Sequence, residues 1–421
     1  MSGGYADRLT FRGAEALGGK LGEREYEDED VSVNAAVDEL GKVIAESRGV
    51  AVYTGAGIST SCGIPDFRGP NGIWTLQAQG LPLPKTEMTL ELASPSLTHM
   101  ALAELVKRGV IKLIVSQNVD DLHRRSGVPE DKLAELHGNC FLEKCHRCKA
   151  TYRRDFEMLT AGFKFTGRRC TKRGCRGKLK DFVLDWDDAL PEDDLAKAEE
   201  YARSKTDVAL CLGTSLRIAP ACQIPVLTKK CGGKLVIVNL QKTPKDKHSD
   251  LKIHAKCDRV MARLMDVLGM EIPPYTRYSE LVVEHTSNAK HVVRSKKQKQ
   301  NNTVFGVRTT SVHGEGCPIP FLDGSASQTL YSPSGKVLEP LVGKVGGWSY
   351  FDCEERGAYR CEFAFPLKPQ LNAPKNPVTH EYRFQIEDGT EEGRETVPLI
   401  TGIRRFDQDR PERRENKKAK I

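Results

Sequence analysis

The sequence predicts an α/β protein in which a doubly wound parallel sheet carries a small inserted cysteine-rich module and precedes a C-terminal all-β domain. Three observations support this prediction. Four β-branched runs, separated by helical stretches, each end in a polar or glycine-containing tail. Two close pairs of cysteines lie between the second and third runs. After Pro273 and Pro274, short alternating runs are separated by Gly, Pro and Asp turns.

Length and composition set the broad class of the protein. A chain of 421 residues suggests two or three domains. With 39% hydrophobic residues, a mean hydropathy of −0.46 and no run near the ~18 apolar residues of a membrane span, no membrane contact is expected. The N-terminus MSGGYADRLTFRG lacks the apolar core of a signal peptide, so we expect an intracellular protein. Its 13 cysteines then indicate buried thiols and a metal site rather than disulfides.

The net charge of +7 is distributed unevenly along the chain. Glu23 to Asp30 carries six acids, whereas Lys290 to Lys299 carries five bases and Arg404 to Lys420 carries eight bases against four acids. Such basic runs are typical of nuclear import signals and of phosphate contacts, so we expect a nuclear protein that contacts chromatin or DNA through them. The alternative is solvated, disordered charge.

The central stretch, Val50 to Trp74, combines an apolar strand, a glycine turn and a polar loop. Gly55, Ala56 and Gly57 predict a turn whose backbone amides approach a phosphate, followed by a helix start. A hydride-transfer domain would have a third glycine where Thr60 stands and an acidic residue ~20 positions later. The next apolar strand begins only at Ile111, so an ordinary dehydrogenase is disfavoured.

The loop after the glycine turn places a carboxylate, a ring and a guanidinium in succession, at Asp66, Phe67 and Arg68. Such a loop, with Trp74 close behind, could close over a cofactor and shield a reactive sugar from water. The alternative interpretation is an ordinary surface loop.

The remaining elements follow in order. Val37 to Ser47 is predicted to be a helix, and Ser94 to cap a second helix that ends at Gly109. Three more buried strands follow, and their carboxyl-terminal tails should meet the glycine turn at one sheet edge, because ligands bind at that edge. These tails are Gln117-Asn118-Val119-Asp120, Gly213-Thr214-Ser215 and Asn239-Leu240-Gln241.

The cysteine pairs predict one structural zinc ion. Cys145 and Cys148 are separated by 21 residues from Cys170 and Cys175, and four thiolates form a closed tetrahedral zinc site. A catalytic zinc would keep an open position and usually a histidine ligand, so no chemistry is assigned to this ion.

His137, in the sequence ELHGN, is the candidate acid/base residue. It lies where the sheet joins the cysteine-rich module, and imidazole changes charge near neutral pH. The alternative is a structural histidine.

The ordered set TGAGIST, GIPDFRG, QNVD, ELHGN, the paired cysteines, GTS and VNLQ strongly resembles the sirtuin family of NAD-dependent protein deacylases, over about residues 30–275. GIPDFRGPNGIW and VLDWDDALP resemble the class IV branch, whose members work on chromatin, and the C-terminal extension resembles plant nuclear members. Two features depart from the usual family pattern. Asp121 replaces a glycine and adds a charge near the nicotinamide pocket, and Asp185-Trp186 replaces Phe-Gly, as in class IV members.

The resemblance implies a Rossmann-like domain that binds NAD. Acylated lysine would enter as an added strand near residues 183–187 and 216–218. His137 would act as general base on a ribose hydroxyl, Asn118 and Asp120 would orient the ribose and the attacking water, and Phe67 would cover the intermediate. The cofactor-binding residues are then predicted to be Gly55, Ala56, Gly57, Thr60, Asp66, Phe67, Arg68, Trp74, Gln117, Gly213, Thr214, Ser215, Asn239, Gln241 and Cys257.

The leading hypothesis is therefore an NAD-dependent protein-lysine deacylase, either a deacetylase or a long-chain deacylase, acting on histone tails. Its products would be deacylated lysine, nicotinamide and O-acyl-ADP-ribose. The alternatives are a mono-ADP-ribosyltransferase and a non-catalytic chromatin-binding scaffold.

These interpretations predict five segments. They are an N-terminal segment (1–33), a sirtuin catalytic domain (34–275) with the zinc module inserted at about 139–182, a basic linker (276–301), an all-β domain (302–406) and a charged basic tail (407–421). The all-β domain is expected to be sandwich-like, and it shows no catalytic or metal-binding pattern. It is either a partner-binding or autoregulatory module or a packing appendage.

Overall fold

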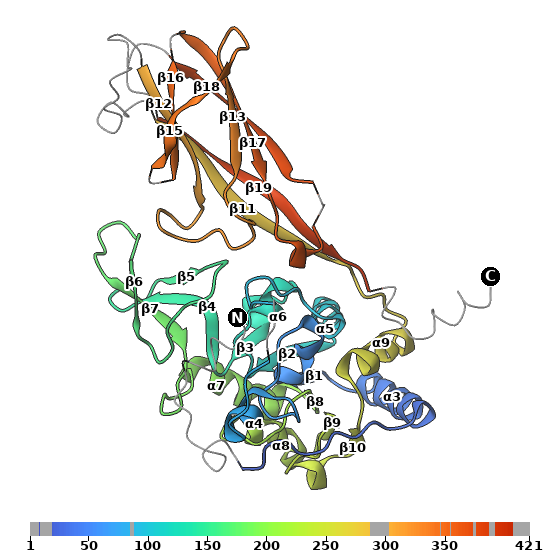
Figure 1. The fold of residues 1–421 in the computed structure, drawn as a ribbon. Coiled ribbons are helices and arrows are strands. Elements are labelled where there is room, and N and C mark those ends of the chain that lie inside the picture. Colours follow the sequence, from blue (N-terminus) through green and yellow to red (C-terminus); the bar gives the residue numbers. More distant parts are fainter. Residues whose placement is uncertain are drawn as a thin grey trace, which may run out of the picture. The chain divides into compact units, whose positions relative to one another are not determined.

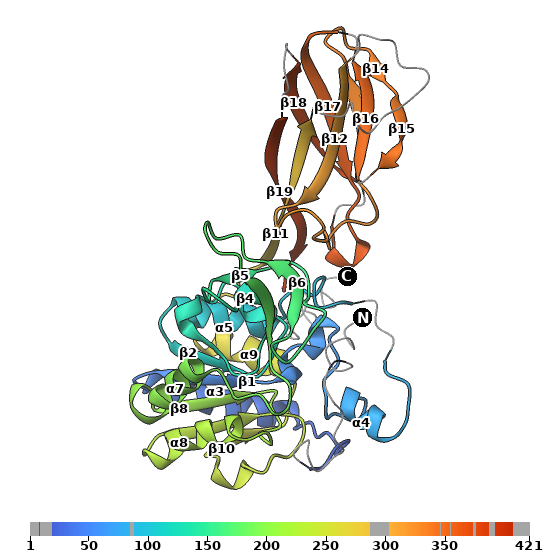
Figure 2. The same ribbon diagram turned by 90° about the vertical axis from the view of Figure 1, so that its left-hand side faces the viewer.

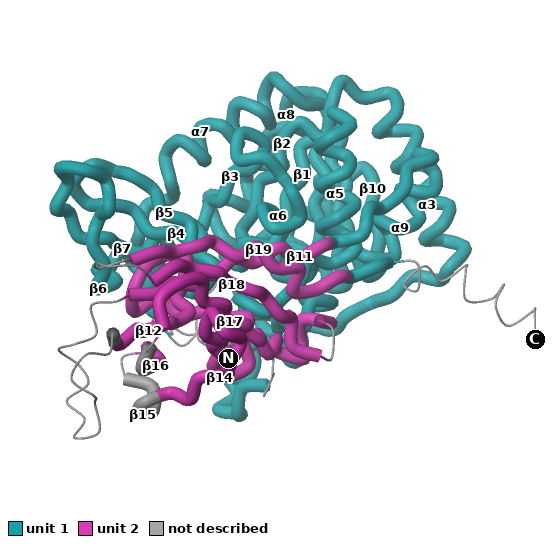
Figure 3. The backbone as a smooth tube through the Cα atoms, turned by 90° about the horizontal axis from the view of Figure 1, so that it is seen from above, with its two compact units in different colours: residues 1–275, 404–421 teal, residues 276–403 magenta. Residues whose placement is uncertain are grey.

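The computed structural model describes residues 8, 19–84, 88–286, 303–345, 347–353, 355–373, 376–386 and 392–406. The chain forms two compact units, residues 1–275 with 404–421 and residues 276–403 (Figure 3). Within the described ranges, no helix has the length and apolar character needed to cross a bilayer. The basic stretches predicted at 290–299 and 407–420 lie outside those ranges.

The first unit is built on a six-stranded parallel sheet (Figure 1). Its strands are β1 (Val50–Thr54), β2 (Ile111–Ser116), β3 (Leu133–Glu135), β8 (Val208–Leu212), β9 (Lys234–Val238) and β10 (Leu251–Ile253). The order β10-β9-β8-β1-β2-β3 runs outward from β1 in both directions, which confirms the doubly wound fold. The crevice at the carboxyl end of β1 is therefore the position where such sheets bind ligands.

Helices cover both faces of this sheet (Figure 2). Val50 and Val52 of β1 face a core shared with α3 (Asp30–Ala45), α5 (Leu97–Lys107) and α9 (Cys257–Val267). Ala51 and Tyr53 face the other side, where α7 (Glu192–Glu200) and α8 (Ile224–Lys230) pack. The short segments are α4 (Ile73–Ala78), α6 (Leu122–Arg125), η1 (Ala56–Ile58), η2 (Thr60–Cys62), η3 (Glu130–Lys132), η4 (Tyr201–Lys205), η5 (Ala221–Gln223) and η6 (Asp246–His248).

Two predicted helix starts are wrong. Helix α3 begins at Asp30 rather than Val37, because Val33 already lies on the buried face. The cap of α5 is Ser96, not Ser94: the Ser96 hydroxyl accepts the N–H of His99 at 3.3 Å and completes a capping box.

The zinc module is an antiparallel sheet in the order β5-β4-β7-β6. Its strands are β4 (Gly138–Cys145), β5 (Thr151–Arg153), β6 (Phe165–Arg169) and β7 (Lys178–Val183). Much of its interior is polar. Buried Asp181 accepts the backbone N–H groups of Phe163 and Lys164 at 3.0 and 2.8 Å, and buried Glu143 pairs with Arg154 at 2.7 Å. In a small module of this kind, a bound metal contributes directly to the folding free energy.

The second unit contains two antiparallel sheets, in the orders β15-β16-β12-β11-β19 and β14-β13-β17-β18. Rings from both sheets meet: His285 of β11 stacks on Phe384 of β18 with centroids 4.4 Å apart. The elements are β11 (Tyr275–Thr286), β12 (Thr303–Ser311), β13 (Ser327–Tyr331), β14 (Val337–Leu338), β15 (Pro340–Val345), β16 (Trp348–Cys353), β17 (Gly357–Phe365), η8 (Pro369–Leu371), β18 (Val378–Ile386) and β19 (Glu392–Arg404).

Both predicted limits of the all-β domain need correction. The basic linker was expected from residue 276, but residues 276–286 belong to β11, because Leu281 and Val283 are buried in the sheet. At the other end, Phe406 packs into the core of the first unit, and Arg404 donates to the Pro95 carbonyl at 3.3 Å. The β unit therefore ends at residue 403.

Candidate active site

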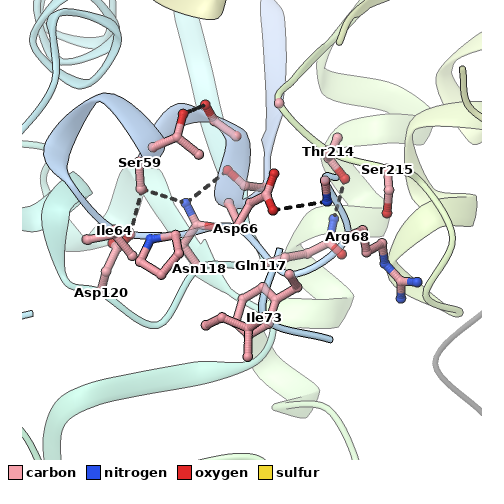
Figure 4. A pocket seen from close by; sticks show the side chains of 18 of the residues that line it. Ser59, Ile64, Asp66, Arg68, Ile73, Gln117, Asn118, Asp120, Thr214 and Ser215 are labelled. Atoms are coloured by element: carbon pink, nitrogen blue, oxygen red, sulfur yellow. Dashed lines mark hydrogen bonds between the residues drawn. The ribbon is translucent and has the colours of Figure 1, made fainter. Parts of the chain in front are cut away.

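A cavity of about 520 Å³ lies at the carboxyl ends of β1, β2, β8 and β9. Every residue predicted to be catalytic or cofactor-binding lines it, from Gly55 in the glycine turn to Cys257 at the start of α9. Figure 4 shows some of these side chains, among them Arg68, Gln117 and Ser215. The backbone near the predicted peptide strand contributes Leu184, Asp185 and Ile218. The four strand tails that the sequence placed together therefore surround one cavity.

The glycine turn is shaped by close backbone packing. A Cβ on Gly55 would lie 2.8 Å from the Gly213 carbonyl oxygen, and one on Gly57 would lie 2.8 Å from Gly213 Cα. The glycines thus let the tail of β1 touch the tail of β8. This packing requires glycine independently of the predicted approach of the backbone amides to a phosphate. The expected helix start is wrong, since the 3₁₀ turns η1 and η2 follow instead.

His137 is held in one orientation at the cavity wall. Its Nδ1 lies 3.1 Å from the Gln117 carbonyl oxygen, which can only accept, so Nδ1 carries the proton and Nε2 is the basic atom. Burial lowers the pKa of His137 to about 4, against the opposing effect of that hydrogen bond. The imidazole is therefore neutral at pH 7, the form that a general base requires.

Asn118, Asp120 and Ser59 form a connected group beside the glycine turn (Figure 4). Asn118 Nδ2 donates to the Gly55 carbonyl at 3.1 Å, which fixes the plane of its amide. Asp120 accepts from the Ser59 hydroxyl at 2.7 Å and from the Leu122 N–H at 3.0 Å. Asp120 therefore anchors η1 to the tail of β2, and Ser59 is a site residue that the sequence analysis missed.

The loop after η2 builds an aromatic wall. Trp74 lies 4.6 Å from Phe67 and 5.2 Å from Trp186, measured between ring centroids. The Arg68 guanidinium lies over the Trp74 ring, and burial lowers the pKa of Arg68 to about 10, so it remains a cation at pH 7. Asp66 turns into its own loop and accepts the Gly69 N–H at 3.0 Å. A buried cation beside apolar rings suits a phosphate linked to a flat base.

Asp121 does not add its charge to the cavity, contrary to expectation. It has a φ of 62°, a left-handed conformation that suits the family's glycine and that aspartate tolerates. Its carboxylate makes no helix-cap bond, and it accepts from Asn139 at 2.8 Å and pairs with Arg125 at 3.6 Å and Arg153 at 3.5 Å. The charge is thereby neutralised within a polar network between β2 and the zinc module.

The four predicted zinc ligands converge. Cys145, Cys148, Cys170 and Cys175 place their sulfur atoms within 4.8 Å of one another. Hydrogen bonds from the backbone N–H groups of Cys148 and Arg147 lower the pKa of Cys145 to about 6, which favours the thiolate. Four convergent sulfurs at this spacing fit one tetrahedral structural zinc ion.

Comparison with known proteins supports the geometry. The Sir2 family model matches residues 55–91 and 82–220. The chain is 49% identical to the NAD-dependent protein deacetylase SRT1 of Arabidopsis thaliana over 76% of this chain and 66% of that protein. It is 48% identical to the NAD-dependent protein deacetylase SRT1 of Oryza sativa subsp. indica, over 81% of this chain and 68% of that protein. It is 41% identical to the NAD-dependent protein deacetylase Sirt6 of Drosophila melanogaster, over 66% of this chain and 89% of that protein.

About a third of each plant relative lies outside the alignment, whereas most of the Drosophila protein is covered. The resemblance derived from the motifs, including the likeness to plant members, is confirmed. Together with the parallel sheet, the converging strand tails and the four-cysteine cluster, these matches show that the chain belongs to the Sir2 family, the sirtuins, which are NAD-dependent protein deacetylases.

Proposed function

We propose that this NAD-dependent protein deacetylase removes acyl groups from lysines in histone tails, and that it works in the nucleus. One observation carries the catalytic part of the proposal: His137 presents an unprotonated Nε2 to the cavity where the tails of β1, β2, β8 and β9 meet. The substrate part rests on the charge of the cavity rim.

NAD, when bound, supplies an electrophilic ribose carbon and nicotinamide as a good leaving group. The residues of this chain position the reactants and move the proton. His137 Nε2 accepts a proton from a ribose hydroxyl, while the Gln117 carbonyl holds Nδ1 and stabilises the imidazolium that forms. Asn118, with its amide fixed by Gly55, orients the ribose, and Phe67 and Trp74 exclude water.

The cavity rim is acidic on the side of the predicted peptide strand. Residues 185–194, DWDDALPEDD, contain six acids and no base. Asp185 and Asp188 line the cavity, and the Asp188 carboxylate accepts the Asp185 N–H at 2.7 Å, which shapes the loop. Asp187 and Asp193 are exposed. Carboxylates on a loop that lines the cavity favour a peptide rich in lysine and arginine, as histone tails are.

Neutralising this rim should weaken the binding of basic peptides selectively. For Asp187→Asn combined with Asp193→Asn, we expect KM for a lysine-rich acetyl-lysine peptide to rise about tenfold at low salt, with kcat nearly unchanged, because rim charges act on encounter and binding. High salt should remove most of the difference. Steady-state kinetics at two ionic strengths measures both effects.

Glu39→Gln combined with Glu46→Gln provides the matched control, since these two exposed residues lose the same number of charges and neither lines the cavity. An equal rise in KM for a neutral acetyl-lysine peptide would show that the loop acts through shape rather than charge. That result would remove the support for a basic substrate.

One assay separates the leading function from its alternatives. The protein is incubated with NAD and acetylated or myristoylated histone peptides, and nicotinamide release and peptide mass are followed. Release that requires the acyl group, with loss of acyl mass, identifies a deacylase and its chain-length preference. Labelling of protein without an acyl group would identify a mono-ADP-ribosyltransferase. If neither acyl-dependent nicotinamide release nor labelling occurs, the protein is a non-catalytic scaffold.

Nuclear location and contact with chromatin rest on the basic stretches at residues 290–299 and 404–420. The full chain is imaged in cells beside a variant in which the lysines and arginines of residues 290–299 are changed to glutamine. Loss of nuclear location in the variant is the expected result if this stretch directs the protein to the nucleus. Exclusion of the unaltered chain from the nucleus would contradict the proposal.

A further inference from the structure

The N-terminal segment crosses the rim of the cofactor cavity as a strap, defined here as residues 21–28. Three backbone hydrogen bonds and one bond to a side chain hold it in place. The Gly22 N–H donates to the Arg68 carbonyl at 3.0 Å, and the Tyr26 N–H donates to the Leu240 carbonyl at 2.9 Å. The Asp28 N–H donates to the His254 carbonyl at 2.7 Å, and the Asp28 carboxylate accepts the His254 N–H at 2.8 Å.

Two side-chain contacts fix the part of the strap nearest the cavity. Gln241 Nε2, at the end of β9, donates to the Glu23 carbonyl at 2.6 Å. The Glu23 carboxylate pairs with Arg217, which follows the tail of β8. The strap is therefore tied to the tails of β8 and β9, two of the four strand ends that form the site.

Glu25 lies between these attachment points and lines the cavity. Glu25 is exposed as a whole residue, and its carboxylate has three charged neighbours: Asp66 in the loop after η2, Glu27 on the strap, and Lys256 just before α9. Burial and the two carboxylates raise the pKa of Glu25, and Lys256 opposes them. The usual pKa of a glutamate carboxyl, about 4.3, lies well below pH 7.

The tail of β9, beside the strap, carries no acidic residue. In dinucleotide-binding sheets a carboxylate near a strand end accepts a hydrogen bond from the ribose 2′-hydroxyl of NAD, whereas a cation in that region accommodates the 2′-phosphate of NADP. Here β9 ends in Asn239, Leu240 and Gln241, and the Gln241 amide is engaged by the strap. Glu25 reaches the same end of the cavity from another element, with the cation Lys256 beside it.

We propose that Glu25 determines the choice of dinucleotide: its carboxylate accepts a hydrogen bond from the adenosine ribose 2′-hydroxyl and repels a 2′-phosphate, so the site takes NAD and rejects NADP. Lys256 explains why a repulsive group is needed, since alone it would attract the phosphate. This inference rests on the NAD site of the proposed function, and it assigns a role in binding, not in the chemical step.

Binding measurements on the full chain test the assignment without relying on turnover. Titration calorimetry gives Kd for NAD and NADP, and for ADP-ribose and its 2′-phosphate, with the unaltered protein and Glu25→Gln. We expect Glu25→Gln to weaken NAD about tenfold, because a charged hydrogen-bond acceptor is lost, and to narrow the NAD-to-NADP preference by more than tenfold. Adding Lys256→Gln to Glu25→Gln should weaken NADP again.

Glu27→Gln is the matched control, because it makes the same charge change two residues away on the strap and does not line the cavity. It should leave the preference for NAD unchanged. If Glu25→Gln weakens both dinucleotides equally, or if both strap variants change the preference equally, the assignment to Glu25 is overturned. An unaltered protein that binds neither dinucleotide would overturn the NAD site itself, a result distinct from failure of the Glu25 assignment.

Discussion

Replacement of His137 by tyrosine should lower kcat for deacetylation by about 10²- to 10⁴-fold, the usual contribution of a positioned general base. Affinity for NAD should change little, since the strand tails that line the rest of the cavity are untouched. His137→Gln, which is closer in size to histidine, should give the same loss. Rapid-quench measurement of nicotinamide release and calorimetric titration of NAD separate the two effects.

The pH dependence provides a readout specific to His137. Its pKa is depressed to about 4 from the usual 6.5, so the basic form is present at neutral pH and is lost as pH falls through 4. We expect an acid limb near this value in kcat/KM of the unaltered protein and none in the residual activity of His137→Gln. His248→Gln, at an exposed position that does not line the cavity, should behave like the unaltered protein. Full activity of His137→Tyr would refute the assignment.

Loss of one zinc ligand should have the largest effect on stability. In Cys170→Ser we expect about one equivalent of zinc to be lost, together with the order of the zinc module, because structural zinc contributes directly to the folding free energy of such modules. The module also contacts the backbone of the candidate base: the Leu184 N–H after β7 donates to the His137 carbonyl at 3.2 Å. Deacetylation should therefore disappear together with the metal.

These losses in Cys170→Ser are measured as zinc content by mass spectrometry, as melting temperature by thermal unfolding, and as turnover of an acetyl-lysine peptide. Cys231→Ser is the control, since Cys231 is an exposed free cysteine outside the four-cysteine cluster. It should keep zinc, melting temperature and activity. A Cys170→Ser protein that retains full zinc and turnover would show that the cluster is not the metal site.

The parallel sheet and its ligand edge could be predicted because they depend on local pattern. β-Branched runs form buried strands, and parallel strands place their carboxyl ends at one edge, so Gly55, Gln117, Gly213 and Asn239 had to lie close together. The zinc ligands were predictable for a similar reason, since cysteine spacing within a short segment limits their separation. The 3₁₀ turns η1 and η2 could not be predicted in this way, because the close packing of Gly55 and Gly57 on Gly213 involves a segment about 150 residues away.

The strap and the Asp121 network illustrate the same limit. Residues 23–30 are an acidic run in the sequence, and the contacts of the strap with Arg68, Leu240 and Gln241 involve groups that only the folded sheet brings close. Asp121 looked like a charge added to the nicotinamide pocket, yet its partners Asn139 and Arg153 come from the zinc module. In both cases the relevant groups are distant in sequence, and local periodicity carries no information about them.

The sequence by itself determined the family, the sheet, the four zinc ligands and the catalytic and cofactor-binding residues predicted to line the cavity, because each depends on the spacing of residue types along a short stretch. The tertiary structure alone decided which ring nitrogen of His137 is basic, that Asp121 is neutralised, and that Glu25 faces the site. The physical reason is that hydrogen bonds and charge interactions depend on distances of a few ångströms between groups that only the folded chain brings together.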